Sequence, residues 1–138
     1  MLRRLLAAVT IVLTMAVAVP ASAVGGGSGS QLRVVSVEMS RGAVLVAVRA
    51  RCDGGGFMRW TVGVEQNVGS TDTVRKDRAG GRVSCDGHAR RRAAELVPSR
   101  GRFHPGNAFL FVSTVGPCTS DVCIGWARGE QVDLTYRR

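Results

Sequence analysis

The sequence offers little of the chemistry that enzymes use. It has only two histidines, His88 and His104, and it contains neither a Gly-x-Ser-x-Gly nucleophile elbow nor a Gly-x-x-x-x-Gly-Lys phosphate loop. Asp86, His88 and His104 could form a metal or acid–base cluster, but both histidines lie beside turn residues, and we interpret them as ordinary polar side chains. We therefore expect a protein that is not an enzyme and holds no metal or cofactor.

Long apolar runs are also missing, apart from one of 15 residues at positions 5–19. Arg3 and Arg4 precede this run, and Ala21-Ser22-Ala23 follows it with the small residues of a cleavage site. Residues 1–23 are therefore typical of a secretory signal peptide. The run is shorter than the roughly 20 residues that a transmembrane helix needs. We expect a secreted mature chain with no membrane span.

The composition excludes several classes of protein. With 45% apolar and 21% charged residues, the chain is neither disordered nor collagen-like, and 138 residues allow a single domain. The Gly/Ser-rich residues 24–30 predict a flexible linker, so the folded domain would span residues 31–138. The formal net charge is +9, and removal of the two signal-peptide arginines would leave the chain basic.

Four cysteines make an even set, which allows three pairings, and export favours disulfides. Cys118 and Cys123 are five residues apart, a spacing suited to a small closed loop, and this leaves Cys52 and Cys85 for each other. A zinc site is the rival interpretation, but zinc ligands prefer two close pairs and Cys52 and Cys85 are isolated. We predict two disulfides.

Alternation of apolar and polar residues is the main structural signal, and it predicts several short strands. It is clearest in residues 43–52, where Cys52 falls on the apolar face and Arg49 and Arg51 on the other, and in residues 57–66. It also occurs at the start of the domain, where Val35, Val37 and Met39 would share a face, and at its end. Turn residues separate the strands at positions 41–42, 53–56, 67–70, 80–81, 86–87, 105–106 and 128–129. This pattern predicts an all-β fold, an immunoglobulin-like antiparallel β-sandwich of about seven strands.

Two segments have more than one interpretation. Residues 89–97 fit either a helix or a strand, and we favour a strand because the arginine run and Pro98 leave room for a short element only. Residues 109–115 are apolar on both faces. They predict a central strand covered on its second face by a loop such as residues 118–126; alternatively, Phe109 and Phe111 line an exposed cleft for an apolar ligand or contact.

The densest charge lies between positions 90 and 102. Such a patch would attract anionic polymers, with a strong dependence on salt. No aromatic residue is interleaved, so specific nucleic-acid binding is not indicated. In a strand these arginines would alternate between faces, and a solvated edge that resists aggregation explains them equally well. The candidate anion-binding residues are Arg90, Arg91, Arg92, Arg100 and Arg102.

Four segments carry a family resemblance. They are Val48-Arg49-Ala50-Arg51-Cys52, Val62-Gly63-Val64-Glu65-Gln66, Cys85-Asp86-Gly87-His88 and Phe103-His104-Pro105-Gly106-Asn107-Ala108. In these the chain resembles small secreted immunoglobulin-like proteins of actinomycete-type bacteria that have no assigned function. The resemblance implies a β-sandwich with a Cys52–Cys85 disulfide and implies no activity.

The chain is more weakly similar to the neocarzinostatin-like apoproteins, which are secreted sandwiches with two disulfides, one of them closing a short loop. That similarity implies an apolar ligand, for which Phe109 and Phe111 are the only candidate residues; no ligand residue is carried over from the family. The known carriers are generally acidic, whereas this chain is basic.

Our leading hypothesis is a secreted, monomeric, non-enzymatic binding module of the cell envelope or extracellular space, whose partner is an anionic envelope polymer or a protein. The alternatives are a carrier of an apolar small molecule, or a protease inhibitor that uses the loop between Cys118 and Cys123.

Overall fold

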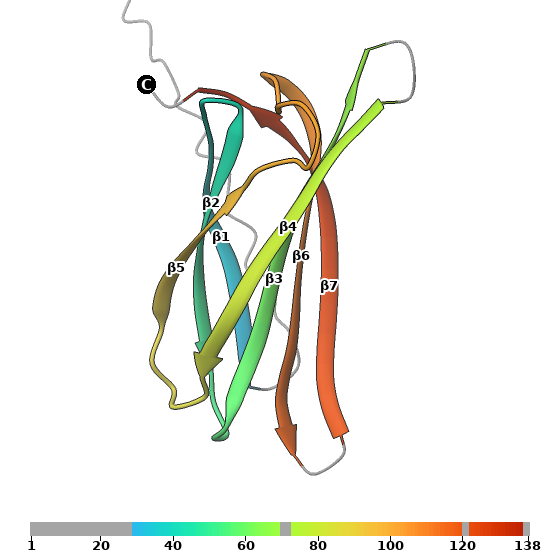
Figure 1. Ribbon diagram of the computed structural model, residues 1–138. Helices are drawn as coiled ribbons and strands as arrows, with labels where there is room; N and C mark the ends of the chain where they lie inside the picture. Colours follow the sequence, from blue (N-terminus) through green and yellow to red (C-terminus); the bar gives the residue numbers. More distant parts are fainter. Residues whose placement is uncertain (1–28, 70–72, 120–121, 137–138) are drawn as a thin grey trace, which may run out of the picture.

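The computed structural model describes residues 29–69, 73–119 and 122–136. These form seven strands in two antiparallel sheets (Figure 1), which confirms the predicted all-β sandwich. The predicted signal peptide, residues 1–23, and most of the predicted linker lie outside the described residues. Within the described ranges, no helix is long and apolar enough to cross a membrane. The strands are β1 (Ser30–Ser40), β2 (Ala43–Cys52), β3 (Phe57–Val68), β4 (Thr73–Ser84), β5 (Arg90–Leu96), β6 (Gly106–Thr119) and β7 (Val122–Leu134).

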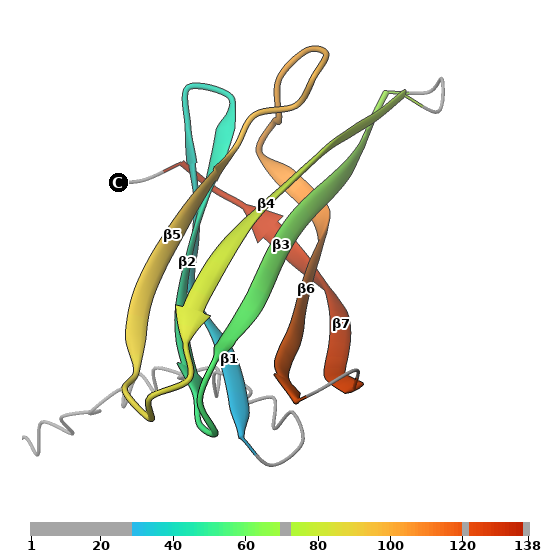
Figure 2. The same ribbon diagram turned by 60° about the horizontal axis from the view of Figure 1, so that its bottom comes forward.

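The two sheets face each other, and one has three strands and the other has four. One has the order β1-β2-β5, and the other has the order β4-β3-β6-β7. The chain crosses between the sheets after β2, β4 and β5, so sequence neighbours are often in different layers (Figures 1 and 2). Residues 90–96 form a strand, as favoured from the sequence, and β6 is a central strand with β3 and β7 on either side.

The core lies between the sheets, where alternate residues of each strand point inward. In β2 and β3 the inward positions are almost completely buried, which is the phase that the sequence predicted. Phe103, 1% exposed, adds a ring to the core from the loop between β5 and β6. The largest fully buried side chains are Phe103, Leu32, Met39, Met58, Leu96, Leu110 and Leu134.

The buried side chain of Gln66 fixes the loop between β5 and β6. Its Nε2 donates to the carbonyl oxygens of His104 at 2.8 Å and Asn107 at 3.3 Å, and its Oε1 accepts the N–H of His104 at 2.9 Å. Both ends of this amide are therefore satisfied, as a side chain only 4% exposed requires. The loop is held against the end of β3.

The structure corrects the predicted strands in two ways. Alternation alone predicted that Val35 shares the inward face of Val37 and Met39. It does not, because a bulge between Val34 and Ser36 leaves Val35 48% exposed. The glycines at 80–81 and 128–129 are not turns but lie inside β4 and β7. Both strands are therefore much longer than predicted.

Two disulfides join the cysteines as predicted, Cys52 to Cys85 and Cys118 to Cys123. The first is buried and links the end of β2 to the residue after β4, so it ties one sheet to the other. The second joins opposite residues of the β6–β7 hairpin and is exposed. By the chain-entropy relation they contribute about 3.8 and about 2.2 kcal/mol. Two disulfides indicate an oxidising, extracytoplasmic environment.

Candidate functional site

A row of three arginines crosses the outer face of the three-stranded sheet. Arg33 of β1 lies directly opposite Arg49 of β2, and Arg49 lies directly opposite Arg91 of β5. Arg49 points away from the core because its neighbours Val48 and Ala50 are buried, and opposite residues share a face. All three side chains are exposed. The fold thus brings together three arginines from three separate segments.

Within the part of the chain that the structure describes, the row has no acidic partner. Among the described residues, no ion pair joins Arg33, Arg49 or Arg91 to a carboxylate. Arg51, the next outward residue of β2, does have an acidic partner, because its guanidinium lies 3.5 Å from the Asp53 carboxylate. Like charges directly opposite one another destabilise a sheet. The row therefore carries a cost that a bound anion would relieve.

The glutamates of this face lie away from the arginine row. Two rows further from the arginines, towards the β1–β2 turn, Glu38 lies opposite Leu45, and Leu45 lies opposite Glu95. The single row between them on this face holds small residues, Ser36, Ala47 and Ala93. The arginine row thus lies at the end of this face that holds the Cys52–Cys85 disulfide, whereas at the other end Glu38 and Glu95 lie near Arg41 and Arg102.

The five arginines singled out in the sequence do not form one patch. Only Arg91 belongs to the row, because successive residues of β5 point to opposite faces. Arg90 is paired with Asp86, and Arg92 donates to the Arg91 carbonyl at 3.1 Å. Arg100 and Arg102 lie in the loop after β5. Arg102 lines a hollow of about 470 Å³ near the β1–β2 turn, together with Arg41 and Glu95.

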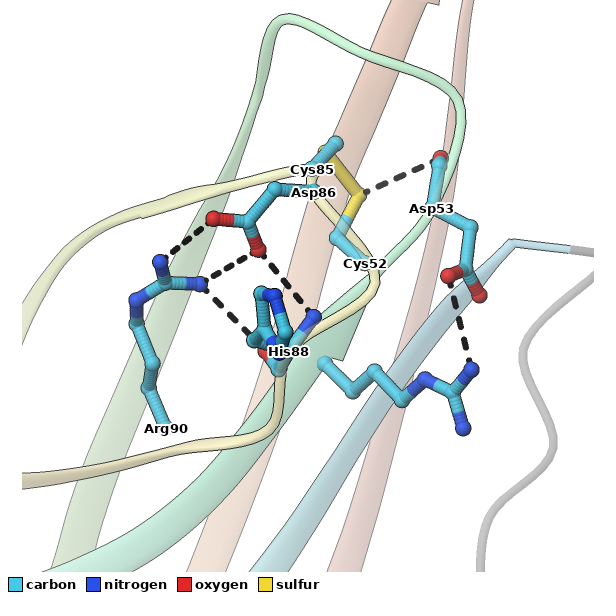
Figure 3. Close-up of a disulfide and its surroundings, with 7 residues drawn as sticks. Cys52, Asp53, Cys85, Asp86, His88 and Arg90 are labelled. Carbon is cyan, nitrogen blue, oxygen red and sulfur yellow. Dashed lines mark hydrogen bonds and ion pairs between the residues drawn. A yellow bond between two sulfur atoms is a disulfide. The ribbon is translucent and has the colours of Figure 1, made fainter.

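A second polar cluster surrounds the buried disulfide (Figure 3). Arg90 donates from Nη1 to Asp86 Oδ1 at 2.7 Å and from Nη2 to Oδ2 at 2.5 Å, and the His88 N–H donates to Oδ1 at 3.1 Å. The Arg90 guanidinium, followed by the His88 N–H, holds the pKa of the Asp86 carboxyl well below its ordinary value. Asp86 in turn raises the pKa of Arg90. This bidentate pair holds the chain just after the disulfide, and with its charges matched it presents no net charge to a ligand.

The histidines are far apart. His88 follows the disulfide, near the start of β3, whereas His104 is held by Gln66, near the other end of the same strand. Asp86, His88 and His104 therefore do not meet. In the described ranges, no group of three or more His, Cys, Asp or Glu side chains is placed to hold a metal ion.

Phe109 and Phe111 lie on the outer face of the four-stranded sheet. We had predicted that a loop such as residues 118–126 covers this face, but most of these residues belong to the β6–β7 hairpin. The side chain of Phe109 is 45% exposed and that of Phe111 is partly buried. A small apolar hollow of about 190 Å³ lies further along the same face, beside the exposed disulfide. It is lined by Phe57, Arg59, Val115, Cys118 and Cys123.

Sequence reasoning placed Arg49 and Arg51 on an outward face but missed the row. The signal was the alternation in residues 43–52, which already put Arg49 outside. Its neighbours Arg33 and Arg91 could be found only once the strand order and register were known.

Comparisons with known proteins assign the chain to no family, since no protein-family model and no curated protein matches it. Among solved structures, it is similar to Spo0M, a sporulation control protein from Bacillus subtilis, with a TM-score of 0.38 and 10% sequence identity. The match covers 83% of this chain and 51% of that one, so this chain spans about half the length of Spo0M.

Proposed function

We propose that the protein is a secreted, non-enzymatic binding module that holds an anionic polymer of the cell envelope on the outer face of its three-stranded sheet. The observation that carries this proposal is the row of Arg33, Arg49 and Arg91, which face one another across three strands with no acidic partner among the described residues. A row of this kind costs stability, so a function that requires it explains its presence.

The geometry of the row suits a phosphate-bearing chain. Neighbouring strands are about 4.8 Å apart, so the three side chains start from positions that span roughly 10 Å across the sheet. A polymer that crosses the strands would meet the three guanidinium groups in turn. Arginine pairs with phosphate through two parallel N–H donors, which gives stronger contacts than a point charge.

Export is supported by two observations of different kinds. The two disulfides indicate an oxidising environment, and the first 23 residues are typical of a signal peptide. The resemblance to small secreted immunoglobulin-like proteins points in the same direction.

The alternative of a carrier for an apolar small molecule has weaker support. A carrier site encloses most of its ligand. Phe109 and Phe111 instead lie along the surface of a sheet, and the hollow that Phe111 lines is otherwise bounded mainly by charged side chains.

Salt-dependent binding tests the proposed function. The full chain would be titrated with a fluorescent poly(glycerol phosphate) between about 50 and 200 mM salt, with neutral dextran as the reference ligand. For a flexible strand, each phosphate contact contributes about −0.7 to the slope of log affinity against log salt concentration. Three contacts therefore predict a slope of roughly −2. Arg49→Gln should reduce that slope by about 0.7.

The matched control is Arg100→Gln, which removes an equal charge from an exposed loop position outside the row. This control should leave the slope close to that of the wild type. If Arg100→Gln reduces the slope as much as Arg49→Gln does, the attraction is a property of net charge and the row has no special role.

A further inference from the structure

The outer face of the four-stranded sheet has two glycines beneath two aromatic rings. A Cβ built at Gly63 of β3 would lie 2.0 Å from Cζ of Phe111, and one built at Gly129 of β7 would lie 2.1 Å from Cζ of Phe109. The far edge of each ring therefore occupies the place of a missing side chain. Phe111 reaches towards β3 and Phe109 towards β7, so both rings lie along the sheet instead of standing away from it.

Beside the Phe111 ring is a hollow of about 410 Å³, a volume in the range of small-molecule sites. It lies between the strands of this face and the loop that follows β5. Asp77 fixes that loop, because its Oδ2 accepts the N–H of Val97 at 2.8 Å. The hollow is lined by Glu65, Lys76, Asp77, Arg78, Ser99 and Phe111.

The lining matches a ligand that is neutral, rich in hydroxyl groups and apolar on one side. Two carboxylates and two cationic groups give the hollow no net formal charge. The carboxylates Glu65 and Asp77 would repel a phosphate, and a purely apolar ligand would strip water from charged groups without replacing its hydrogen bonds. Sugar hydroxyls both donate to carboxylates and accept from Lys76 and Arg78.

We propose that this hollow binds a neutral saccharide, with the C–H face of one pyranose ring packed on Phe111 and its hydroxyls bonded to the charged rim. Gly63 is what allows the ring to lie along the sheet, so the platform depends on a position that never touches the ligand. This site lies on the opposite outer face from the arginine row, and it does not depend on the function proposed there.

Titration calorimetry of the full chain with neutral tetrasaccharides tests the proposal. The probes are the β-1,4-linked tetramers of glucose and of N-acetylglucosamine and the α-1,4-linked tetramer of glucose. We expect one of them to bind, and Phe111→Ala to weaken that binding about tenfold or more, because the stacking contact is lost. Gly63→Ala should weaken it too, because the added Cβ displaces the ring.

Three variants make the result interpretable. Glu65→Ala alters an exposed side chain of the rim and should also weaken binding, so the test does not rest on Phe111→Ala alone if that variant folds poorly. Phe57→Ala removes an exposed ring outside the hollow and should leave binding unchanged. Arg49→Gln should leave it unchanged as well, which separates this site from the polymer face.

Several outcomes would overturn the proposal. One is that none of the three tetramers binds at concentrations up to about 10 mM, because any affinity weaker than that is too weak for a specific site. Another is tetramer binding that Phe111→Ala and Glu65→Ala leave intact. A third is binding of a short oligothymidylate that Phe111→Ala abolishes, which would make the ring a stacking platform for single-stranded nucleic acid.

Discussion

Replacing Arg49 by glutamine should stabilise the protein, although such exposed positions usually tolerate substitution with little effect. Arg49 is the middle member of its row and faces a like charge on each side, Arg33 on β1 and Arg91 on β5. The substitution removes both repulsions and keeps a side chain of similar length. Arg33→Gln and Arg91→Gln each remove only one.

The magnitude follows from the spacing of the strands. Two unit charges about 6 Å apart in water repel by roughly 0.7 kcal/mol, so the two neighbours of Arg49 together contribute roughly 1.4 kcal/mol before screening. The side chains diverge and counterions screen them, so both effects lower this repulsion. We expect a total gain in stability of about 0.5–1 kcal/mol from Arg49→Gln. In a domain of this size, that raises the melting temperature by roughly 2–6 °C. The end variants should each give about half as much.

Thermal melts at about 10 mM and about 1 M salt, where the Debye lengths are about 30 and 3 Å, provide the assay. The gain from Arg49→Gln should be present at low salt and nearly absent at high salt. Arg49→Lys keeps the charge and should show no gain, and Arg100→Gln should show little. A lower melting temperature for Arg49→Gln, or a gain that persists at high salt, would refute the reasoning.

Two further predictions concern the core and the acidic range. Phe103→Ala should destabilise the fold by about 3–5 kcal/mol, because that ring is buried, whereas Phe109→Ala should cost clearly less, and urea unfolding would measure both. Arg90→Gln should raise the pKa of Asp86 towards the ordinary aspartate value of about 3.9, as carboxyl NMR shifts against pH would show. Because the folded-state pKa of Asp86 is depressed, the stability that the Asp86–Arg90 pair contributes is present at neutral pH and is lost as the pH falls below about 4. Arg90→Gln should therefore weaken the dependence of stability on pH in this range. An unchanged titration would mean that the pair seen in the structure does not control the Asp86 carboxyl.

The sequence was sufficient for the phase of the strands but not for their extent. Alternation in residues 43–52 predicted the bounds of β2 and the inward direction of Cys52 correctly, because one face of each strand is buried. The glycines at 80–81 were misinterpreted as a turn. They lie within β4, where Gly81 packs against the indole of Trp60. The neighbour that explains such a glycine is on another strand, so its own segment does not show it.

The candidate site was only partly predictable, for a similar reason. A run of three arginines drew attention to positions 90–92, yet consecutive residues of a strand face opposite ways, and only Arg91 joined the outer row. Arg33 occurs alone in its segment, and Arg49 has only Arg51 near it, an arrangement that is ordinary on the outward face of a strand. Their meeting depends on the order β1-β2-β5 and on the pairing of Arg33 with Arg49, which alternation within one strand does not reveal.

The Cys52–Cys85 bond also determines how the chain would respond to a pulling force, such as an exported protein meets when a tethered partner moves. The whole of β3 and β4 lies between these two cysteines, which are 33 positions apart. At about 3.3–3.6 Å per extended residue, roughly 110 Å of chain is enclosed in the loop and bears no tension while the bond is intact. Force applied at the two ends would pass from β2 through the disulfide to the segment before β5. The hairpin that carries Gly63 and the charged rim of the saccharide hollow would stay outside the line of tension.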